Sequence, residues 1–179
     1  GLIIAMLGAV LREMFDKGIN DASDVQSIVR DPVLASVPKA HTVSNGVPVV
    51  ITKPRGRAAE EVRRLTTNIS FVTPKDLNQP NVIIVTSTNP REGKTTVSVN
   101  MAAAFAEKGK SVLLIDADVR HPSVAPALGM NSGVGLVSLL AGEVSAKEAI
   151  QPYWKSYLQV LPAEEQKTPS GIILGSDAM

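Results

Sequence analysis

The side chains that could do chemistry in this chain are concentrated in the loop of residues 88–96. A helix that begins in this loop would offer free N–H groups and a partial positive charge, which together bind phosphate. Gly93 lets the backbone approach the phosphates, and Lys94 supplies a mobile positive charge. The Thr95 hydroxyl is suited to ligate Mg²⁺. These residue types predict a nucleoside-triphosphate site formed by Thr88, Asn89, Pro90, Arg91, Glu92, Gly93, Lys94, Thr95 and Thr96.

Two carboxylates, Asp116 and Asp118, follow the apolar run Val112–Ile115. In a regular strand the two side chains would point to opposite faces, and only one could face a phosphate. We therefore expect the chain to turn at Asp116, so that one or both carboxylates hold a metal ion through water. The chain has no cysteine and two distant histidines, which excludes thiolate and histidine metal sites. The expected metal is Mg²⁺, which prefers oxygen ligands.

The elements around these residues alternate between strand and helix. We predict a buried strand at Val82–Val85, a helix from Lys94 to about Lys108 and a second buried strand at Val112–Ile115. Further elements are expected as short helices at 136–140 and 146–150 and a strand at 158–161. This order predicts an α/β fold with a doubly wound, mainly parallel sheet, whose ligand lies at the carboxyl ends of the strands.

Three regions are expected along the chain. Residues 1–11 are apolar and are predicted to be the end of a transmembrane helix, since a complete spanning helix needs roughly 20 such residues. The lysine and arginine that follow this run favour a cytoplasmic side. Residues 12–56 are expected to be a juxtamembrane segment and linker, and residues 57–179 a nucleotide-binding domain that opens with a helix at 57–72. The net charge of +1 gives no reason to expect nucleic acid as a partner.

Four segments resemble motifs of one family, the bacterial tyrosine kinases. The run from Ser87 to Thr96 resembles their Walker A motif, and the run from Leu114 to Pro122 resembles their Walker A′ motif. The segments Gly135–Gly142 and Val160–Ala163 are similar to two further motifs of that family. The resemblance implies a P-loop NTPase fold. Arg91 departs from the pattern, because the family usually has glycine there.

The resemblance implies autophosphorylation on tyrosine with ATP and Mg²⁺, which controls the synthesis and export of a capsular or extracellular polysaccharide. It implies that Lys94 binds phosphate, that Thr95 ligates the metal, and that Asp116 and Asp118 serve the metal and the incoming hydroxyl. It also implies a place at the bacterial plasma (inner) membrane, with the kinase domain on the cytoplasmic side. The chain shows no Walker B aspartate and no tyrosine-rich tail, so we expect it to be a fragment that is inactive without the rest of the protein.

The helix expected at 57–72 resembles the motif through which these kinases assemble into homo-oligomers. Glu60 and Arg63 match that motif, but Thr66 replaces its second arginine, which weakens it. The other implied partner is the polysaccharide co-polymerase and export machinery, to which the membrane segment belongs.

Two other functions fit parts of the pattern. A partitioning or septum-positioning ATPase shares the fold and the Walker A′ motif, although such proteins usually carry a second lysine near the start of the loop. A non-catalytic chain-length regulator would bind nucleotide only to report or to dock. A periplasmic loop between two membrane helices and a terminal tyrosine cluster in the complete reading frame would indicate the kinase.

Overall fold

The computed structural model describes residues 25, 31–38, 43–44, 46–73, 80–154 and 157–164. The chain divides into two compact units, Gly1–Ser36 and Val37–Met179, and all candidate site residues belong to the second. The expected transmembrane segment at 1–11 lies outside the described residues. Within the part that is described, no helix is long and apolar enough to cross a membrane.

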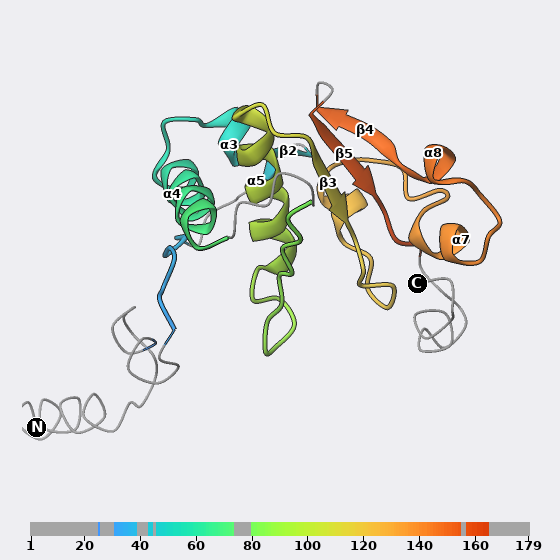
Figure 1. The fold of residues 1–179 in the computed structure, drawn as a ribbon, viewed down its shortest axis with the longest axis horizontal. Coiled ribbons are helices and arrows are strands. Elements are labelled where there is room, and N and C mark those ends of the chain that lie inside the picture. Colours follow the sequence, from blue (N-terminus) through green and yellow to red (C-terminus); the bar gives the residue numbers. More distant parts are fainter. Residues whose placement is uncertain are drawn as a thin grey trace, which may run out of the picture. The chain divides into compact units, whose positions relative to one another are not determined.

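The second unit is built on a three-stranded sheet with the order β3-β5-β4 (Figure 1). Strand β3 (Val112–Ile115) pairs in parallel with β5 (Leu158–Leu161), and Val112 lies opposite Leu158. Strand β4 (Gln151–Trp154) pairs with β5 in the antiparallel direction. The described sheet is therefore mixed. It contains the two strands predicted at 112–115 and 158–161.

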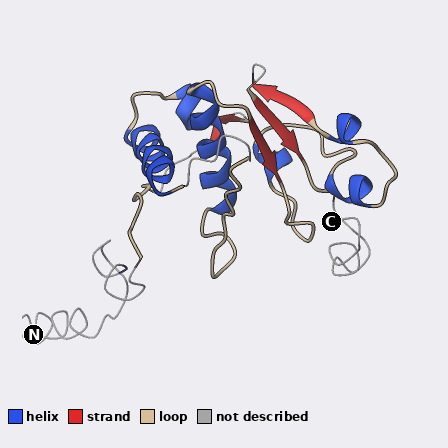
Figure 2. Ribbon diagram, in the orientation of Figure 1, coloured by secondary structure: helices blue, strands red, loops and turns tan. Residues whose placement is uncertain are grey.

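Helix α5 (Lys94–Glu107) covers one face of this sheet. Its alanines Ala102, Ala103 and Ala106 pack against Leu158, with Val112 and Leu114 of β3 partly buried beside them. Small side chains on the helix let it approach the strands closely, which fixes the position of its N-terminus relative to the end of β3. In Figure 2 the sheet separates α3, α4 and α5 from α7 and α8.

A second layer packs on the outer side of α5. The hairpin of β1 (Val43–Ser44) and β2 (Val47–Pro48) leads into α3 (Val49–Thr52), and α4 (Arg57–Val72) follows as predicted. Val50, Ala59, Val62 and Ala104 form a buried cluster that joins α3, α4 and α5. Residues 46–52 were expected to lie in the linker, but they belong to the compact unit because their apolar side chains are needed in this cluster.

Three short helices complete the unit: α6 (Val124–Ala127), α7 (Leu136–Leu140) and α8 (Ala146–Ala149). Helix α7 has the predicted bounds, and α8 begins with a capping box of Ser145 and Glu148. Helix α6 and strand β4 were not predicted. Both are four residues long and contain a proline, so neither has a strong local signal.

The predictions of buried strands at 82–85 and 112–115 are wrong in part. Val82–Val85 forms no strand, and Val82 and Ile84 are 81% and 85% exposed. Strand β3 is present but buried on one face only, since Leu113 and Ile115 point away from α5 and are exposed. In the described structure β3 is an edge strand, and nothing described covers its second face. Val37, in the segment expected to be linker, also packs against the cluster of α3, α4 and α5.

The junction of α7 with the end of β5 is held by Glu164. Its carboxylate accepts hydrogen bonds from the amides of Gly135, Val137 and Ser138 at the start of α7. Gly135 is required here, because a Cβ at this position would lie 2.0 Å from the carbonyl oxygen of Pro162. Partial burial raises the pKa of Glu164, but the hydrogen bonds from Ser138 and Val137 outweigh this effect and hold the pKa below its ordinary value of 4.5.

We expect Glu164→Gln to lower the free energy of unfolding at pH 7 by about 1–3 kcal/mol, because a charged acceptor of several amides is lost. The pKa of Glu164 is lowered by folding, so its contribution is complete above 4.5 and is lost as pH falls through the folded-state pKa. The difference between wild type and variant should therefore shrink between pH 7 and pH ~3 in urea titrations. Glu143→Gln, an exposed change nearby, is the control; a constant difference across this range would contradict the assignment.

Candidate functional site

The loop before α5 is closed by its own side chains. The Glu92 carboxylate accepts hydrogen bonds from the backbone amide and the side-chain amide of Asn89, at 3.0 and 2.9 Å. These bonds, the backbone one first, lower the pKa of Glu92. The Ser87 hydroxyl donates a hydrogen bond to the carbonyl oxygen of Asn89. It also accepts one from the ammonium group of Lys94, at 3.3 Å. The loop therefore keeps its shape through local bonds, and Lys94 lies across its opening.

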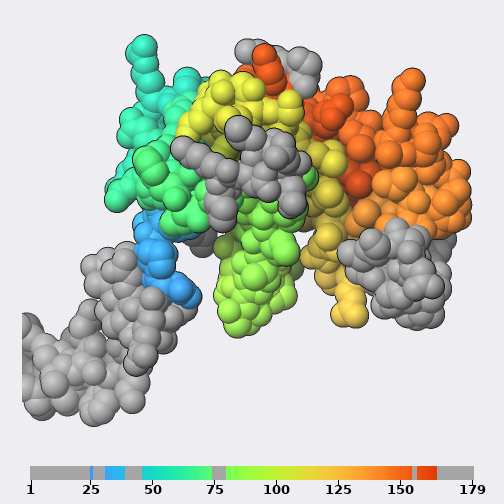
Figure 3. Space-filling model, in the orientation of Figure 1, coloured from blue at the N-terminus to red at the C-terminus, as the bar shows by residue number. Residues whose placement is uncertain are grey.

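Gly93 places the start of α5 at the inner end of this loop. It is the N-cap residue and has φ of +97°, in the left-handed region that a residue with a Cβ adopts only with strain. No acidic side chain lies in the first turn of α5. The amides of Lys94, Thr95 and Thr96 thus form the helix N-terminus predicted to receive phosphate. Figure 3 shows this loop in green and the segment that follows β3 in gold, as two separate projections on the same side of the molecule.

Arg91 also has a positive φ, +65°, and is exposed. The sequence departs from the family pattern at this residue, where a glycine is usual. A left-handed conformation costs a residue with a Cβ on the order of 1 kcal/mol, so the glycine of the pattern has a backbone reason. The structure places the Arg91 side chain on the outside of the loop, where it does not fill the space in front of Gly93.

The chain turns at Asp116, as predicted. Strand β3 ends at Ile115, and the Asp116 side chain is buried. Its Oδ1 accepts the amide of Asp118 at 3.1 Å, and its Oδ2 accepts the amides of Ser123 and Val124 at 2.9 Å each. Three amides on one carboxylate fold residues 117–124 into a compact loop. Asp116 thus organises the loop, and it keeps at most one lone pair for a metal-bound water.

Asp118 lies on the exposed side of the same loop. Its Oδ1 accepts the amide of His121 at 3.1 Å, which leaves its other oxygen open to solvent. His121 also lines a hollow of about 430 Å³, together with Pro122, Ser123, Pro126 and Ser132. Of the two aspartates, Asp118 has the exposed carboxylate and is bonded to a residue of this hollow.

A hydrogen bond between side chains joins the two halves of the site. The hydroxyl of Thr95, in the first turn of α5, lies 2.6 Å from the hydroxyl of Ser123, which precedes α6. The structure therefore brings together the nucleotide loop and the loop after β3, as predicted for residues at one edge of a sheet. Ser123 was not singled out from the sequence. Its only local signal is that of a serine preceding a short helix, which predicts a cap.

These oxygens fit a magnesium site of the expected kind. Among the described residues, no group of three or more His, Asp or Glu side chains could hold a metal. Mg²⁺ is commonly bound by one or two protein oxygens together with the phosphates of its nucleotide. The Thr95 hydroxyl would be one such ligand, and the carboxylates of Asp116 and Asp118 would hold the metal through water.

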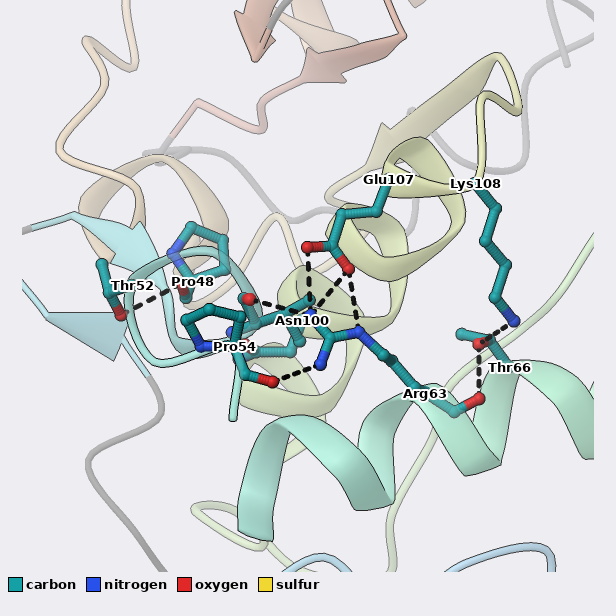
Figure 4. A network of polar contacts seen from close by, with 9 residues as sticks. Pro48, Thr52, Pro54, Arg63, Thr66, Asn100, Glu107 and Lys108 are labelled. Carbon is teal, nitrogen blue, oxygen red and sulfur yellow. Dashed lines mark hydrogen bonds and ion pairs between the residues drawn. The ribbon is translucent and has the colours of Figure 1, made fainter. Parts of the chain in front are cut away.

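Helix α4 carries the predicted assembly motif, and its Arg63 makes its contacts within this chain (Figure 4). The guanidinium of Arg63 donates to both carboxylate oxygens of Glu107 in α5, at 3.0 and 3.1 Å, and to the carbonyl oxygens of Pro54 and Val50. Thr66, which replaces the second arginine of the motif, is buried. Its hydroxyl accepts a hydrogen bond from the ammonium group of Lys108 at 2.9 Å. Both residues therefore bind α4 to α5, and Glu60 remains exposed in the first turn of α4.

We expect Arg63→Lys to lower the free energy of unfolding by about 1 kcal/mol, since an ammonium cannot bridge both Glu107 oxygens and two carbonyls. Arg64→Lys is the matched control. Arg64 is one residue along the same helix, 69% exposed, and meets Glu61 only at 3.9 Å. Urea titration of both variants tests this, and an equal effect of the two changes would contradict the role of Arg63.

Comparison with known proteins relates the chain to nucleotide-binding proteins. Residues 83–146 match the family described as the CobQ/CobB/MinD/ParA nucleotide binding domain. The chain is 39% identical over 113 residues to tyrosine-protein kinase YwqD of Bacillus subtilis (strain 168), which covers 63% of this chain and 47% of that protein. The solved kinase domain of the Escherichia coli tyrosine kinase ETK matches 87% of this chain, and 64% of its own length, with a TM-score of 0.74 and 26% identity. This chain is related to the bacterial tyrosine kinases.

The P-loop NTPase fold predicted from the motifs is confirmed by these relatives. A further relative is the succinoglycan biosynthesis transport protein ExoP of Rhizobium meliloti (strain 1021), 31% identical over 183 residues, which covers 99% of this chain and 20% of that protein. The chain thus spans about half the length, or less, of the curated relatives it matches. The family match over residues 83–146 includes the nucleotide loop and the loop after β3.

Proposed function

We propose that this chain is the ATP-binding part of a protein-tyrosine kinase that phosphorylates itself. The observation that carries the proposal is the hydrogen bond between Thr95 and Ser123, because it joins the first turn of α5 to the loop that Asp116 holds after β3. Transfer of a phosphoryl group depends mainly on position and on charge held near the transferred oxygens. The relatives named above as tyrosine kinases support this reaction for the whole protein.

Each residue has a separate task in the proposed reaction. The amides of residues 93–96 and the ammonium of Lys94 bind the phosphates of ATP and neutralise the charge that grows on them. Thr95 ligates Mg²⁺, which when bound draws charge from the phosphate oxygens. Asp116 holds the loop that carries Asp118. Asp118 accepts a hydrogen bond from the incoming tyrosyl hydroxyl and orients its oxygen toward the phosphate.

We propose that the tyrosyl acceptor enters through the hollow that His121 lines. The hollow is lined by two prolines, which pack well against an aromatic ring, and by His121 and two serines. His121 connects the hollow to Asp118 through its backbone amide. The two tyrosines of the described structure are poor acceptors at this place, because the Tyr153 hydroxyl donates to the carbonyl oxygen of Gly46 and Tyr157 lies beyond β4.

The relatives also support a proposal for where the kinase acts and what it binds. We propose that it acts at the cytoplasmic side of the bacterial plasma membrane, joined to a polysaccharide co-polymerase and export machinery, as the name of the relative ExoP suggests. We also propose that it forms homo-oligomers. Since Arg63 and Thr66 are used inside the chain, Glu60 and the other exposed residues of α4 are the ones left to contact a second copy.

Incubation of the full-length protein with labelled ATP and Mg²⁺ tests the proposal. The expected result is label on tyrosine, which is alkali-stable and is recognised by an antibody against phosphotyrosine. Release of free phosphate without labelled tyrosine would instead identify an ATPase of the partitioning or septum-positioning type. Nucleotide binding without either product would identify a non-catalytic chain-length regulator.

A further inference from the structure

Ser123 stands where a helix cap is expected but does not act as one. It is the N-cap residue of α6, yet its hydroxyl makes no hydrogen bond to the amides of that helix. A serine at this position normally caps the helix with its side chain. Here the carboxylate of Asp116 accepts the amides of Ser123 and Val124 instead. The Ser123 hydroxyl is therefore available for another partner, and that partner is Thr95 at 2.6 Å.

The direction of this bond decides what Thr95 can do. A neutral hydroxyl ligates a cation through an oxygen lone pair, so its proton must point away from the metal. The Ser123 oxygen lies at the right distance to accept that proton. When Thr95 donates to Ser123, its oxygen lone pairs are left for a cation at the start of α5, where the phosphates and their metal are expected. In metal sites, such partners of a ligand fix its orientation and affect affinity.

We propose that Ser123 is a positioning residue for magnesium: it accepts the Thr95 proton and thereby orients the Thr95 oxygen as a ligand. Asp116 holds Ser123 in place by its backbone amide, so the Walker A and Walker A′ loops share one chain of bonds, Asp116 to Ser123 to Thr95. The proposal rests on the proposed nucleotide site. It gives the loop after β3 a role in metal binding through a residue that itself touches neither the metal nor the phosphate.

The test compares ADP binding by the full-length protein with Mg²⁺ and with EDTA, measured by calorimetry. In wild type Mg²⁺ should tighten ADP binding. We call the ratio of ADP affinity with Mg²⁺ to ADP affinity with EDTA the gain from Mg²⁺. In Ser123→Ala this gain should fall on the order of 10-fold, while the ADP affinity in EDTA stays unchanged. Ser123→Thr keeps the hydroxyl and should restore the gain. On a Thr95→Val background, where the ligand is gone, Ser123→Ala should change the gain by less than about twofold.

Two results would overturn the proposal. If Ser123→Ala weakens ADP binding equally with Mg²⁺ and with EDTA, the residue only maintains the shape of the loop. If the gain from Mg²⁺ is the same as in wild type, the bond to Thr95 does not orient a ligand. Failure of the wild-type protein to bind ADP with Mg²⁺ would instead overturn the proposed function, so the two failures are distinguishable.

Discussion

Replacing Lys94 with methionine is expected to weaken binding of Mg-ATP by about 1.5–3 kcal/mol, roughly 10- to 150-fold in the dissociation constant. Methionine keeps the length and bulk of the side chain and removes its charge. In the structure the ammonium of Lys94 lies 3.3 Å from the hydroxyl of Ser87, a long hydrogen bond to a neutral group. The ammonium can therefore leave this partner for a phosphate at little cost, and the charge-assisted bonds that form are stronger.

Titration of the full-length protein with ATP measures this effect. Lys110→Met is the matched control, because Lys110 is exposed and lies beyond the far end of α5 from the loop. It should bind ATP as wild type does. If Lys94→Met binds ATP with the wild-type affinity, the loop of residues 88–96 is not the phosphate site.

Elements with a clear local period could be predicted from the sequence. The bounds of α4, α7, β3 and β5 agree with the predicted ones, and α5 begins at Lys94 as expected. Each of these has either a helical spacing of apolar residues or a short, mostly apolar run. The failure at Val82–Val85 has a physical reason. An apolar run indicates what could be buried, but burial needs a partner, and the described sheet offers this segment none.

The helix start at Gly93 and the turn at Asp116 could be predicted, because both depend on residue type and on position at a helix start or strand end. The chemical roles of Lys94 and the two aspartates stay predictions. Ser123 and Glu164 were missed because their partners lie 26–29 residues away in the chain. No local pattern shows that a serine before a helix will contact Thr95. Such contacts depend on how the loops meet, which only the fold decides.

Replacing Asp116 is expected to lower the stability of the fold, whereas replacing Asp118 is expected to lower catalysis with the fold intact. Asp116→Asn is expected to cost about 2–4 kcal/mol in the free energy of unfolding, because an amide NH₂ would face at least one of three amide donors and leave buried groups unpaired. Asp118→Asn should change stability by less than about 1 kcal/mol, since its carboxylate is exposed and accepts one amide. Urea titration of the two variants measures this difference directly.

The effects of the two variants on phosphoryl transfer should differ from their effects on stability. Asp118→Asn, with the fold intact, is expected to reduce autophosphorylation at least about 100-fold while ATP binding changes little, because the charge matters most in the transition state. Asp116→Asn should lose transfer and stability together, since the loop that carries Asp118 depends on it. If Asp118→Asn phosphorylates itself at the wild-type rate, Asp118 does not touch the acceptor. If Asp116→Asn is as stable as wild type, the loop after β3 is held by other bonds, and Asp116 is free to take the metal itself.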